Sequence, residues 1–432
     1  MQQREAEKAV TRDSVLCLPG IETSPLSKLR QLQDERLAAL IDRAYHLSGF
    51  YRRLMDAIGI RPGEIKGVED LQHLPATKYS GEMSAQDMLA VPRDKVSVVL
   101  TTSGTTGLPK VIYLSQTDLE RWKAQFARLS CVWGVGKGDV IMAGYPFPAI
   151  FDGFTAAGAM LLPFTHVSFS LDNQIRQIER LKVTAILSGP ATFLSLVKRA
   201  REMGVDLKNA GMRVGILGGE TWSQSFRKRM ETDLGMKFYD LYGSAEVGHP
   251  ASECAAQDGM HIWEDLYVVE ILNPETNEPV ALGKAGEIVV TPLWREAMPF
   301  IRYRTGDLAA RLGYKQCVCG RTLPKISRIK GRIEHMVKVK GGNVFPGDVE
   351  EVVQAAHECS GEYQIMVDRP GSLDSLKVRV ECSLDQTPSG AMRKKLEADL
   401  LKATGVASEV ELVAYGGLVR GPQFKGKRVV RT

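Results

Sequence analysis

Short apolar stretches alternate with amphipathic ones from about residue 96 to residue 265, and this alternation constrains the fold most. The stretches "DVIMAGY", "VTAILSG" and "MRVGILGGE" are apolar and partly β-branched, which predicts strands. Between them, "ATFLSLVKRAREMG" and "QSFRKRMETDLG" repeat apolar positions every three or four residues, which predicts helices. This order is typical of βαβ units, in which helices cover the faces of a sheet, so we expect an α/β fold.

The flanking regions differ from this middle part. Residues 27–60 predict helix, and the chain becomes richer in strands after residue 265. The last hundred residues predict the order strand, helix, strand, strand, helix, strand, which describes a small α+β domain. A chain of 432 residues exceeds one typical core. We therefore expect an N-terminal domain at 1–331 and a C-terminal domain at 332–432, with ligands at their interface.

Composition narrows the class of partner. The chain has 56 Lys and Arg against 51 Asp and Glu, and the basic residues are spread out, which suits an anionic small molecule better than nucleic acid. No apolar run approaches the ~20 residues that span a bilayer, and the polar N-terminus does not resemble a secretory signal. Seven cysteines do not suit a disulfide framework. We expect a reduced, cytoplasmic protein that binds neither membrane nor nucleic acid.

The segment "VLTTSGTTGLPK", residues 99–110, joins two predicted strands. Its glycines allow close approach of the backbone to a ligand, and successive N–H groups together with five hydroxyls and Lys110 can bind an anion such as a polyphosphate. It is not a P-loop, because its lysine follows a proline and no helix opens directly after it. An ordinary solvated turn is the alternative at this point.

Four later segments complete a pattern: "LYGSAEVG" at 241–248, "YRTGDLA" at 303–309, "RIKGRIEHMVKVKGGNVFPGDVEE" from residue 328, and the terminal "QFKGKRVVRT". In this order, with the loop at 99–110, they resemble the adenylate-forming superfamily of acyl-CoA ligases, and more closely its phenylacetate–CoA ligase-like branch. The resemblance runs from about residue 27 to the end of the chain. It implies a large N-terminal adenylate-forming domain with helix-covered β-sheets and a small mobile α+β C-terminal domain.

The resemblance also implies a reaction and its cofactors. A carboxylic acid attacks the α-phosphate of ATP in the presence of Mg²⁺ and forms an acyl-adenylate and pyrophosphate. The small domain then rotates, and the thiol of CoA attacks the acyl group and releases AMP. Adenylation and transfer to the thiol take place at the same site but need different surroundings. The small domain must therefore present a different face to the site in each step.

Site residues follow from the resemblance by position. Tyr242 would stack on adenine, Asp307 would accept the ribose hydroxyls, and Glu246 would hold Mg²⁺. Lys110 and Glu246 join the catalytic group. The full ATP- and AMP-binding set is Ser103, Gly104, Thr105, Thr106, Gly107, Gly218, Gly219, Glu220, Asp240, Tyr242, Gly243, Ser244, Asp307 and Arg332. The hinge would lie at residues 333–334, and the CoA-facing set is Lys338, Lys340, Gly341, Gly342 and Asn343.

The adenylation lysine has two candidates near the C-terminus. Lys427 fits a "GK" followed by Arg431, whereas Lys425 fits two lysines before "RV". We favour Lys427 and keep Lys425 as the alternative.

The chain departs from the family pattern at three places. Ala245 replaces the usual Ser or Thr, Glu334 replaces the hinge aspartate, and Leu171 and Asp172 replace paired glycines near the acid pocket. The acid therefore need not be phenylacetate itself.

The acid pocket is expected around "AGYPFPAIFDGF", whose aromatic side chains suit a flat ring. Packing of a strand and helix in the core explains some of these aromatics equally well. The expected pocket comprises Tyr145, Phe147, Phe151, His166, Gly218, Gly243 and His249. Phenylacetate is the family default, and a hydroxy- or aminobenzoate is the rival because His166, Asp172 or His249 could bind a ring substituent.

A second cluster combines thiols with an imidazole. Cys254 lies seven residues before His261, and Cys317 lies two before Cys319, which suits a structural zinc with three thiolates and one imidazole. Ordinary buried cysteines are the alternative. A similar arrangement in the related ligases favours zinc, and His249 is a possible replacement ligand. The other four cysteines, Cys17, Cys131, Cys359 and Cys382, have no expected partners.

Two other classes of function remain open. One is a free-standing adenylating enzyme that passes the acyl group to a carrier protein, an amine or a hydroxyl. The other is a nucleotide-binding regulator without turnover. A homodimer is also an open expectation, because the helical segment before residue 60 is short for a complete domain.

Overall fold

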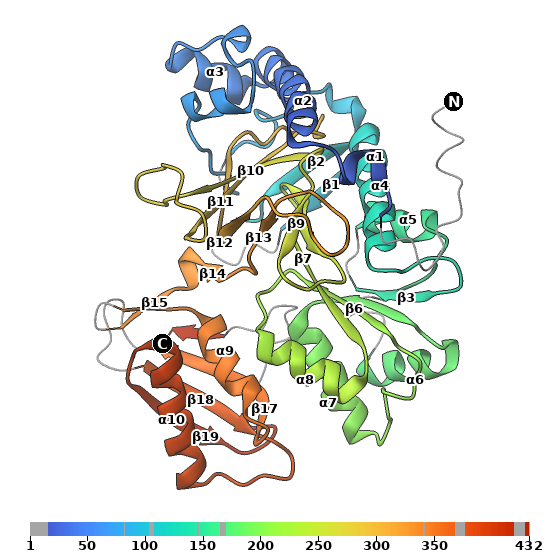
Figure 1. The fold of residues 1–432 in the computed structure, drawn as a ribbon, viewed down its shortest axis with the longest axis vertical. Coiled ribbons are helices and arrows are strands. Elements are labelled where there is room, and N and C mark those ends of the chain that lie inside the picture. The colour runs from blue at the N-terminus through green and yellow to red at the C-terminus, as the bar shows by residue number, and fades with distance from the viewer. Residues whose placement is uncertain are drawn as a thin grey trace.

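The structure is a computed structural model that describes residues 16–81, 83–102, 108–144, 147–164, 170–339, 342–367, 376–418 and 428–431. A larger N-terminal part extends along the longest axis of the molecule, and a smaller C-terminal part lies at one end of it, beside the green helices (Figure 1). The loop residues Ser103–Gly107, Tyr145, His166, Lys340, Gly341, Lys425 and Lys427 lie outside the described residues. Their expected roles stay predictions.

Residues 27–60, which were expected to form one helical segment, contain two helices. The short α1 (Pro19–Glu22) precedes α2 (Leu26–Leu47). Ser48 separates α2 from α3 (Gly49–Ala57), and its hydroxyl caps α3 by accepting a hydrogen bond from the backbone N–H of Tyr51. A stripe of α2 packs into the main core: Leu29, Leu37, Leu40, Ile41 and Ala44. Three short 3₁₀ helices follow, at Pro62–Glu64, Val68–His73 and Arg93–Lys95.

The two strands expected around the hydroxyl-rich loop are present. β1 (Val96–Thr101) and β2 (Val111–Ser115) form an antiparallel sheet of their own. The chain then enters α4 (Gln116–Val132), whose N-terminus is capped by the Ser115 hydroxyl. α4 packs closely against α5 (Pro148–Ala156).

The βαβ region forms the parallel half of a 12-stranded sheet, as the alternation predicted. Strands pair in the order β7-β6-β5-β3-β4, all parallel, because a helix connects most of them. The strands are β3 (Val140–Ala143), β4 (Met160–Pro163), β5 (Ala185–Ser188), β6 (Val214–Gly218) and β7 (Lys237–Ser244). The helices are α6 (Leu171–Leu181), α7 (Pro190–Glu202) and α8 (Gln224–Leu234). The carboxyl ends of β6 and β7 therefore open on one edge of the sheet.

The other half of this sheet is antiparallel. It consists of β8 (Gly248–Glu253), β9 (Met260–Ile262), β10 (Tyr267–Leu272), β11 (Ala285–Pro292), β12 (Tyr303–Gly313), β13 (Lys325–Ile326) and β14 (Gly331–Arg332). β7 turns directly into β8, and β14 pairs with β12 so that Arg332 lies opposite Asp307. This pairing brings two predicted nucleotide-binding residues together.

The C-terminal part has its own sheet and core. The six predicted elements are present, but the structure has a second strand before the first helix, β16, and a further strand at the end, β20. A hairpin of β15 (Val337–Val339) and β16 (Gly342–Val344) precedes a sheet ordered β19-β18-β17-β20. Its elements are α9 (Pro346–Ala355), β17 (Cys359–Val367), β18 (Leu376–Cys382), α10 (Gly390–Thr404), β19 (Ser408–Val413) and β20 (Val429–Arg431). The short helix Ile333–His335 connects this part to β14, and the division at residue 331 stays a prediction.

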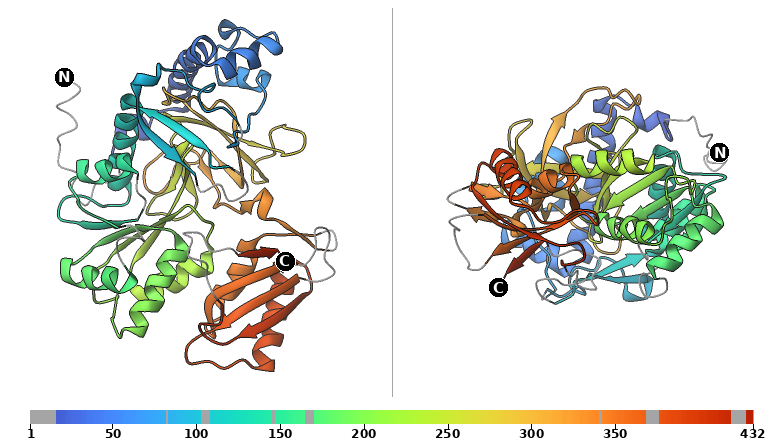
Figure 2. Two further views of the ribbon diagram at one scale, coloured as in Figure 1. Left: turned by 180° about the vertical axis from the view of Figure 1, so that it is seen from behind. Right: turned by 90° about the horizontal axis from the view of Figure 1, so that it is seen from below.

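Polar contacts join the two parts. Glu351 of α9 accepts hydrogen bonds from the Ser225 hydroxyl (2.6 Å) and backbone N–H (3.2 Å) of α8. Lys198 of α7 lies 2.6 Å from Glu381 of β18. Seen from behind, the orange and red C-terminal part lies beside the green helices (Figure 2). The interface is therefore built from α7 and α8 on one side and from α9 and β18 on the other.

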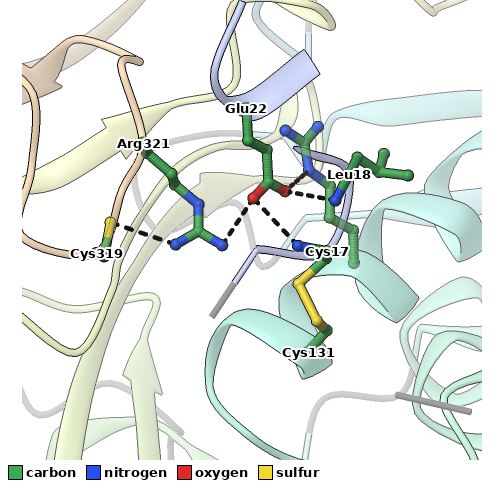
Figure 3. The surroundings of a disulfide bond; sticks show 7 residues. Cys17, Leu18, Glu22, Cys131, Cys319 and Arg321 are labelled. Atoms are coloured by element: carbon green, nitrogen blue, oxygen red, sulfur yellow. Dashed lines mark hydrogen bonds and ion pairs between the residues drawn. A yellow bond between two sulfur atoms is a disulfide. The ribbon is translucent and has the colours of Figure 1, made fainter. Parts of the chain in front are cut away.

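Cys17 and Cys131 form a disulfide, so the expectation that these two cysteines have no partners was wrong, and so was the expectation of a fully reduced chain. They are 114 residues apart, and sequence spacing alone does not reveal such a pair. The bond attaches the segment before α1 to the last turn of α4 (Figure 3). Within the described part of the chain, none of the helices combines the length and apolar character of a membrane span.

Reduction of this disulfide is expected to destabilise the protein by about 2–4 kcal/mol, because it closes a long loop and restricts the unfolded chain. Urea unfolding followed by circular dichroism, with and without reductant, measures the change. The Cys17→Ser variant is expected to show the same loss and no further response to reductant. An identical unfolding midpoint for oxidised and reduced wild type would contradict the bond.

Candidate functional site

The neck of the hydroxyl-rich loop is closed by hydrogen bonds between its two ends. The backbone N–H of Thr102 donates to the carbonyl of Lys110 (3.1 Å), and the N–H of Lys110 donates to the Thr102 hydroxyl (3.2 Å). These bonds fix where Lys110 leaves the loop. The long side chain of Lys110 then extends away from β2 toward β7 and β12.

Lys110, Glu246 and Tyr303 meet although the chain separates them widely. The Lys110 Nζ lies 2.7 Å from the Glu246 Oε1, and the Tyr303 hydroxyl lies 3.0 Å from both atoms. Burial raises the pKa of Glu246, but the charge and hydrogen bond of Lys110 outweigh it and hold that pKa below its usual value. Burial and the nearby Glu246 raise the pKa of the Tyr303 phenol, so the hydroxyl stays protonated. An ionised carboxylate therefore stands beside a cation.

Asp307 lies next to this cluster. Its Oδ2 accepts a hydrogen bond from the Tyr242 hydroxyl (3.0 Å), and its Oδ1 lies 3.8 Å from the Arg332 Nε. Burial and the Asp307 charge raise the pKa of Tyr242 well above its usual value. The structure thus brings together Tyr242, Asp307 and Arg332, three of the predicted nucleotide-binding residues.

Arg295 supports the turn that carries Glu246. Its Nη2 donates to the backbone carbonyls of Ala245 (2.6 Å) and Glu246 (2.7 Å). The guanidinium is buried and lies 4.9 Å from the centroid of the Trp294 ring, and burial lowers its pKa. The sequence analysis missed both Arg295 and Tyr303. Tyr303 stood within the quoted "YRTGDLA", whereas no motif signalled Arg295.

The end of β6 provides the predicted glycines. A Cβ on Gly218 would lie 2.5 Å from the Leu241 carbonyl, and Gly219 has a φ of +77°, so the chain requires glycine at both positions. The neighbouring Asp240 is buried, accepts a hydrogen bond from the Trp222 indole (3.0 Å) and lies 3.5 Å from Arg328. Burial raises the pKa of Asp240 above its usual range.

These contacts give Asp240 a structural environment, and its role in nucleotide binding stays a prediction. The same holds for Glu220, which is partly buried after Gly219, and for Ser244, which is partly exposed in β7.

Aromatic rings gather beside the Glu246 turn. Phe147 lies 5.8 Å from Trp122 between ring centroids, and Trp122 lies 5.7 Å from His249. Phe151 is half-buried, whereas Phe154 is fully buried against Phe126 and belongs to the core.

Two further observations bear on the expected pocket. A Cβ on Gly243 would lie 2.5 Å from the His249 Cδ2, so the imidazole borders the motif at 241–248. Asp172 was expected as a possible contact for a ring substituent of the acid. Its carboxylate instead forms an ion pair with the Arg199 guanidinium (2.6 and 2.9 Å). Among the described candidates for a polar contact to the acid, His249 remains.

The C-terminal part contributes the hairpin of β15 and β16. Lys338 lies opposite Asn343 in this hairpin, and both side chains are exposed. At the end of the chain, Arg428 lies 3.1 Å from Glu362 and 4.4 Å from the centroid of the Tyr363 ring. Arg428 therefore anchors the strand that follows the predicted catalytic lysines.

Cys254, His261, Cys317 and Cys319 come together as predicted, and all four are buried with ligand atoms within 4.8 Å of one another. The Cys254 and Cys317 sulfurs are 3.7 Å apart, and the Cys319 sulfur is 3.4 Å from the His261 Nε2. Ligand atoms of a tetrahedral zinc lie about 3.5–3.8 Å apart. The His261 Nδ1 faces the Leu323 carbonyl (3.1 Å), an orientation that suits a metal ligand. The donor set and its spacing fit zinc.

An ion network connects this cluster to the disulfide (Figure 3). Arg321 donates to the Cys319 sulfur (3.4 Å) and lies 2.9 Å from Glu22, whose other oxygen accepts from the Arg128 Nε (2.7 Å). Glu22 also accepts from the backbone N–H of Cys17 (3.2 Å). The buried carboxylate thus joins α1, α4 and the cysteine-rich loop.

Comparisons with known proteins cover nearly the whole chain. The model of a family described as AMP-binding enzyme matches residues 52–292, and that of an AMP-binding enzyme C-terminal domain matches residues 341–432. A phenylacetate-coenzyme A ligase of Thermus thermophilus is 34% identical and aligns with 95% of this chain and 98% of its own length. The Escherichia coli phenylacetate-coenzyme A ligase is 34% identical, over 95% of this chain and 96% of its own.

Solved structures of a 2-hydroxyisobutyryl-CoA ligase are also similar. In the postadenylation state with 2-HIB-AMP, that enzyme matches with a TM-score of 0.91 at 26% identity, over 97% of this chain and 93% of its own. In the thioesterification state with 2-HIB-AMP and CoA the TM-score is 0.71, over the same fractions. The two parts of the present chain are therefore arranged as in the postadenylation state.

The Tyr303→Phe variant is expected to bind MgATP about tenfold more weakly, because the hydroxyl that joins Lys110 to Glu246 is lost. Calorimetric titration with MgATP measures the dissociation constant. Tyr314→Phe is the matched control, since the exposed Tyr314 bonds to Glu264 outside the cluster. Equal affinity of wild type and Tyr303→Phe would contradict the role of this cluster.

Proposed function

The chain belongs to the family of AMP-binding enzymes and is an AMP-forming acid–CoA ligase, and we propose that it activates an aromatic or arylacetic acid. The family that the sequence motifs indicated is thus confirmed. The observation that carries the proposal is the aromatic group Trp122, Phe147 and His249, which Arg295 connects to the turn of Glu246. The Arg295 guanidinium carbon lies 5.9 Å from the centroid of the Trp122 ring, and its Nη2 donates to the Glu246 carbonyl (2.7 Å). A flat acid bound against these rings would hold its carboxylate near the nucleotide phosphates.

In the proposed first step, the loop at 103–107 and Lys110 hold the β- and γ-phosphates, and Asp307 accepts the ribose hydroxyls. The Glu246 carboxylate would hold Mg²⁺, and the ion would supply positive charge that offsets the negative charge of the phosphates. Glu246 suits this role because Lys110 keeps it ionised. Lys427, with Lys425 as the alternative, would stabilise the carboxylate and the α-phosphate as they react. Arg428, the residue after Lys427, is held by an ion pair with Glu362.

In the second step, we propose that the C-terminal part rotates about the segment Ile333–His335. The exposed Lys338 and Asn343, together with Lys340, Gly341 and Gly342, would then face the incoming CoA. Rotation must break the contacts Ser225–Glu351 and Lys198–Glu381, which hold the present arrangement. The domain division near residue 331 is part of this proposal.

We also propose a structural Zn²⁺ at Cys254, His261, Cys317 and Cys319. Three thiolates and one imidazole leave no open position for catalysis. The ion would fix the loop after β8 to the segment before β13. A cytoplasmic location and a homodimer remain predictions, and a carrier-protein thiol is the acceptor against which CoA must be compared.

Pyrophosphate release with MgATP is expected for aryl or arylacetic acids and not for aliphatic ones, including 2-hydroxyisobutyrate. AMP and an acyl-CoA should form in equal amounts once CoA is present. Lys427→Ala should slow pyrophosphate release by ~10²–10³-fold, and Lys425→Ala by much less.

The same assay separates the alternatives. Pyrophosphate release without an acyl-CoA product would move the acceptor to a carrier protein or another nucleophile. Activity confined to aliphatic acids would contradict the aromatic pocket. ATP binding without any release of pyrophosphate would contradict catalytic activity and favour a nucleotide-binding regulator.

Purified protein is expected to contain about one zinc per chain by elemental analysis. Cys317→Ser should lose most of this zinc and unfold at lower temperature, because metal binding stabilises the folded state. Cys359→Ser, which changes a buried thiol outside the cluster, should keep the metal. Zinc-free wild-type protein with unchanged stability would contradict the site.

A further inference from the structure

The tautomer of His249 is determined by its neighbour. The Trp122 indole Nε1 lies 3.1 Å from the His249 Nδ1. An indole N–H can only donate, so Nδ1 must accept and carries no proton. Burial of the imidazole away from water disfavours its charged form and lowers the pKa of His249 to about 3, so the ring is neutral near pH 7. A neutral ring with a bare Nδ1 carries its proton on Nε2.

The orientation of this ring is fixed as well. The Gln125 amide donates to the His249 carbonyl (2.7 Å), and the His249 N–H donates to the Tyr267 hydroxyl (3.2 Å). The Tyr267 hydroxyl in turn donates to Gln125 (3.0 Å), which closes the set of bonds. The Phe126 ring packs edge-on against the imidazole at 4.8 Å. The bonds to Gln125 and Tyr267 hold the backbone of His249, and a rotation of the imidazole would break its contacts with Trp122 and Phe126.

The Cδ2 side of the ring, next to the protonated Nε2, lies against the nucleotide motif. Cδ2, the carbon bonded to Nε2, is the atom that a Cβ on Gly243 would meet at 2.5 Å, and Gly243 follows Tyr242 in the nucleotide motif. Trp122, on the other edge of the imidazole, contacts Phe147 of the expected acid pocket. Among the residues that the structure describes, none accepts a hydrogen bond from Nε2. The Nε2–H of His249 is therefore an oriented hydrogen-bond donor among aromatic side chains.

We propose that the Nε2–H of His249 donates a hydrogen bond to an oxygen substituent on the aryl group of the acid. This inference rests on the proposed function and narrows its substrate to hydroxy- or methoxy-substituted aryl acids. A neutral donor surrounded by aromatic rings matches an uncharged ring oxygen. The reacting carboxylate would lie at the opposite end of the acid, toward Lys110.

The test compares pairs of acids that differ only in the group at one ring position. For hydroxy- and methyl-substituted phenylacetates and benzoates at each ring position, kcat/KM for pyrophosphate release is measured. At one position, wild type should prefer the hydroxy acid over its methyl analogue by about 10- to 100-fold. His249→Phe should reduce this ratio to about one, whereas His73→Phe, which changes an exposed histidine, should keep it.

Trp122→Phe provides a second variant in case His249→Phe does not fold. It keeps the imidazole but removes the donor that fixes the tautomer, so the ratio should fall, though less than with His249→Phe. No preference in wild type, or a preference kept in both variants, would overturn the inference. An equal loss for both acids of a pair would also overturn it, because His249 would then contact the shared part of the acid. Activity without selectivity overturns this inference alone, and the lack of activity with every acid overturns the proposed function too.

Discussion

The ion pair between Lys110 and Glu246, with the Tyr303 hydroxyl bonded to both, is the contact on which the site depends. It joins the loop after β1, the turn after β7 and the start of β12. Without a cation beside it, burial would favour the protonated form of Glu246, and a neutral carboxyl is a poor ligand for a divalent metal. The buried Arg295 fixes the same turn from beneath, so the position of Glu246 is set on two sides.

Much of the fold was predictable because its patterns are local. The βαβ alternation, the two strands around the hydroxyl-rich loop and six of the elements in the C-terminal part follow from short-range periodicity, whereas β16 and β20 were not predicted. The break at Ser48 was missed because a helix that ends and restarts keeps nearly the same apolar spacing. The disulfide was missed because Cys17 and Cys131 meet only after α1 docks on α4, a contact that no local pattern encodes.

The site residues that belong to short sequence motifs could be predicted. Tyr242, Glu246 and Asp307 come together as expected, and so do the four residues of the cysteine–histidine cluster. Arg295 could not be predicted, because a buried arginine that binds backbone carbonyls looks like any charged residue in the sequence. The tautomer of His249 likewise depends on Trp122, which lies 127 positions away. Long-range packing, rather than residue type, decides these two roles.

In the proposed reaction, the carboxylate of an acid attacks the α-phosphate of ATP at this site. The most direct measurement supplies an aryl acid labelled with ¹⁸O in its carboxyl group, together with MgATP and CoA, and analyses the products by mass spectrometry. One ¹⁸O atom is expected in AMP, because the acyl–adenylate bond breaks at the acyl carbon when the thiol attacks. Label in inorganic phosphate, with ADP as the nucleotide product, would contradict it.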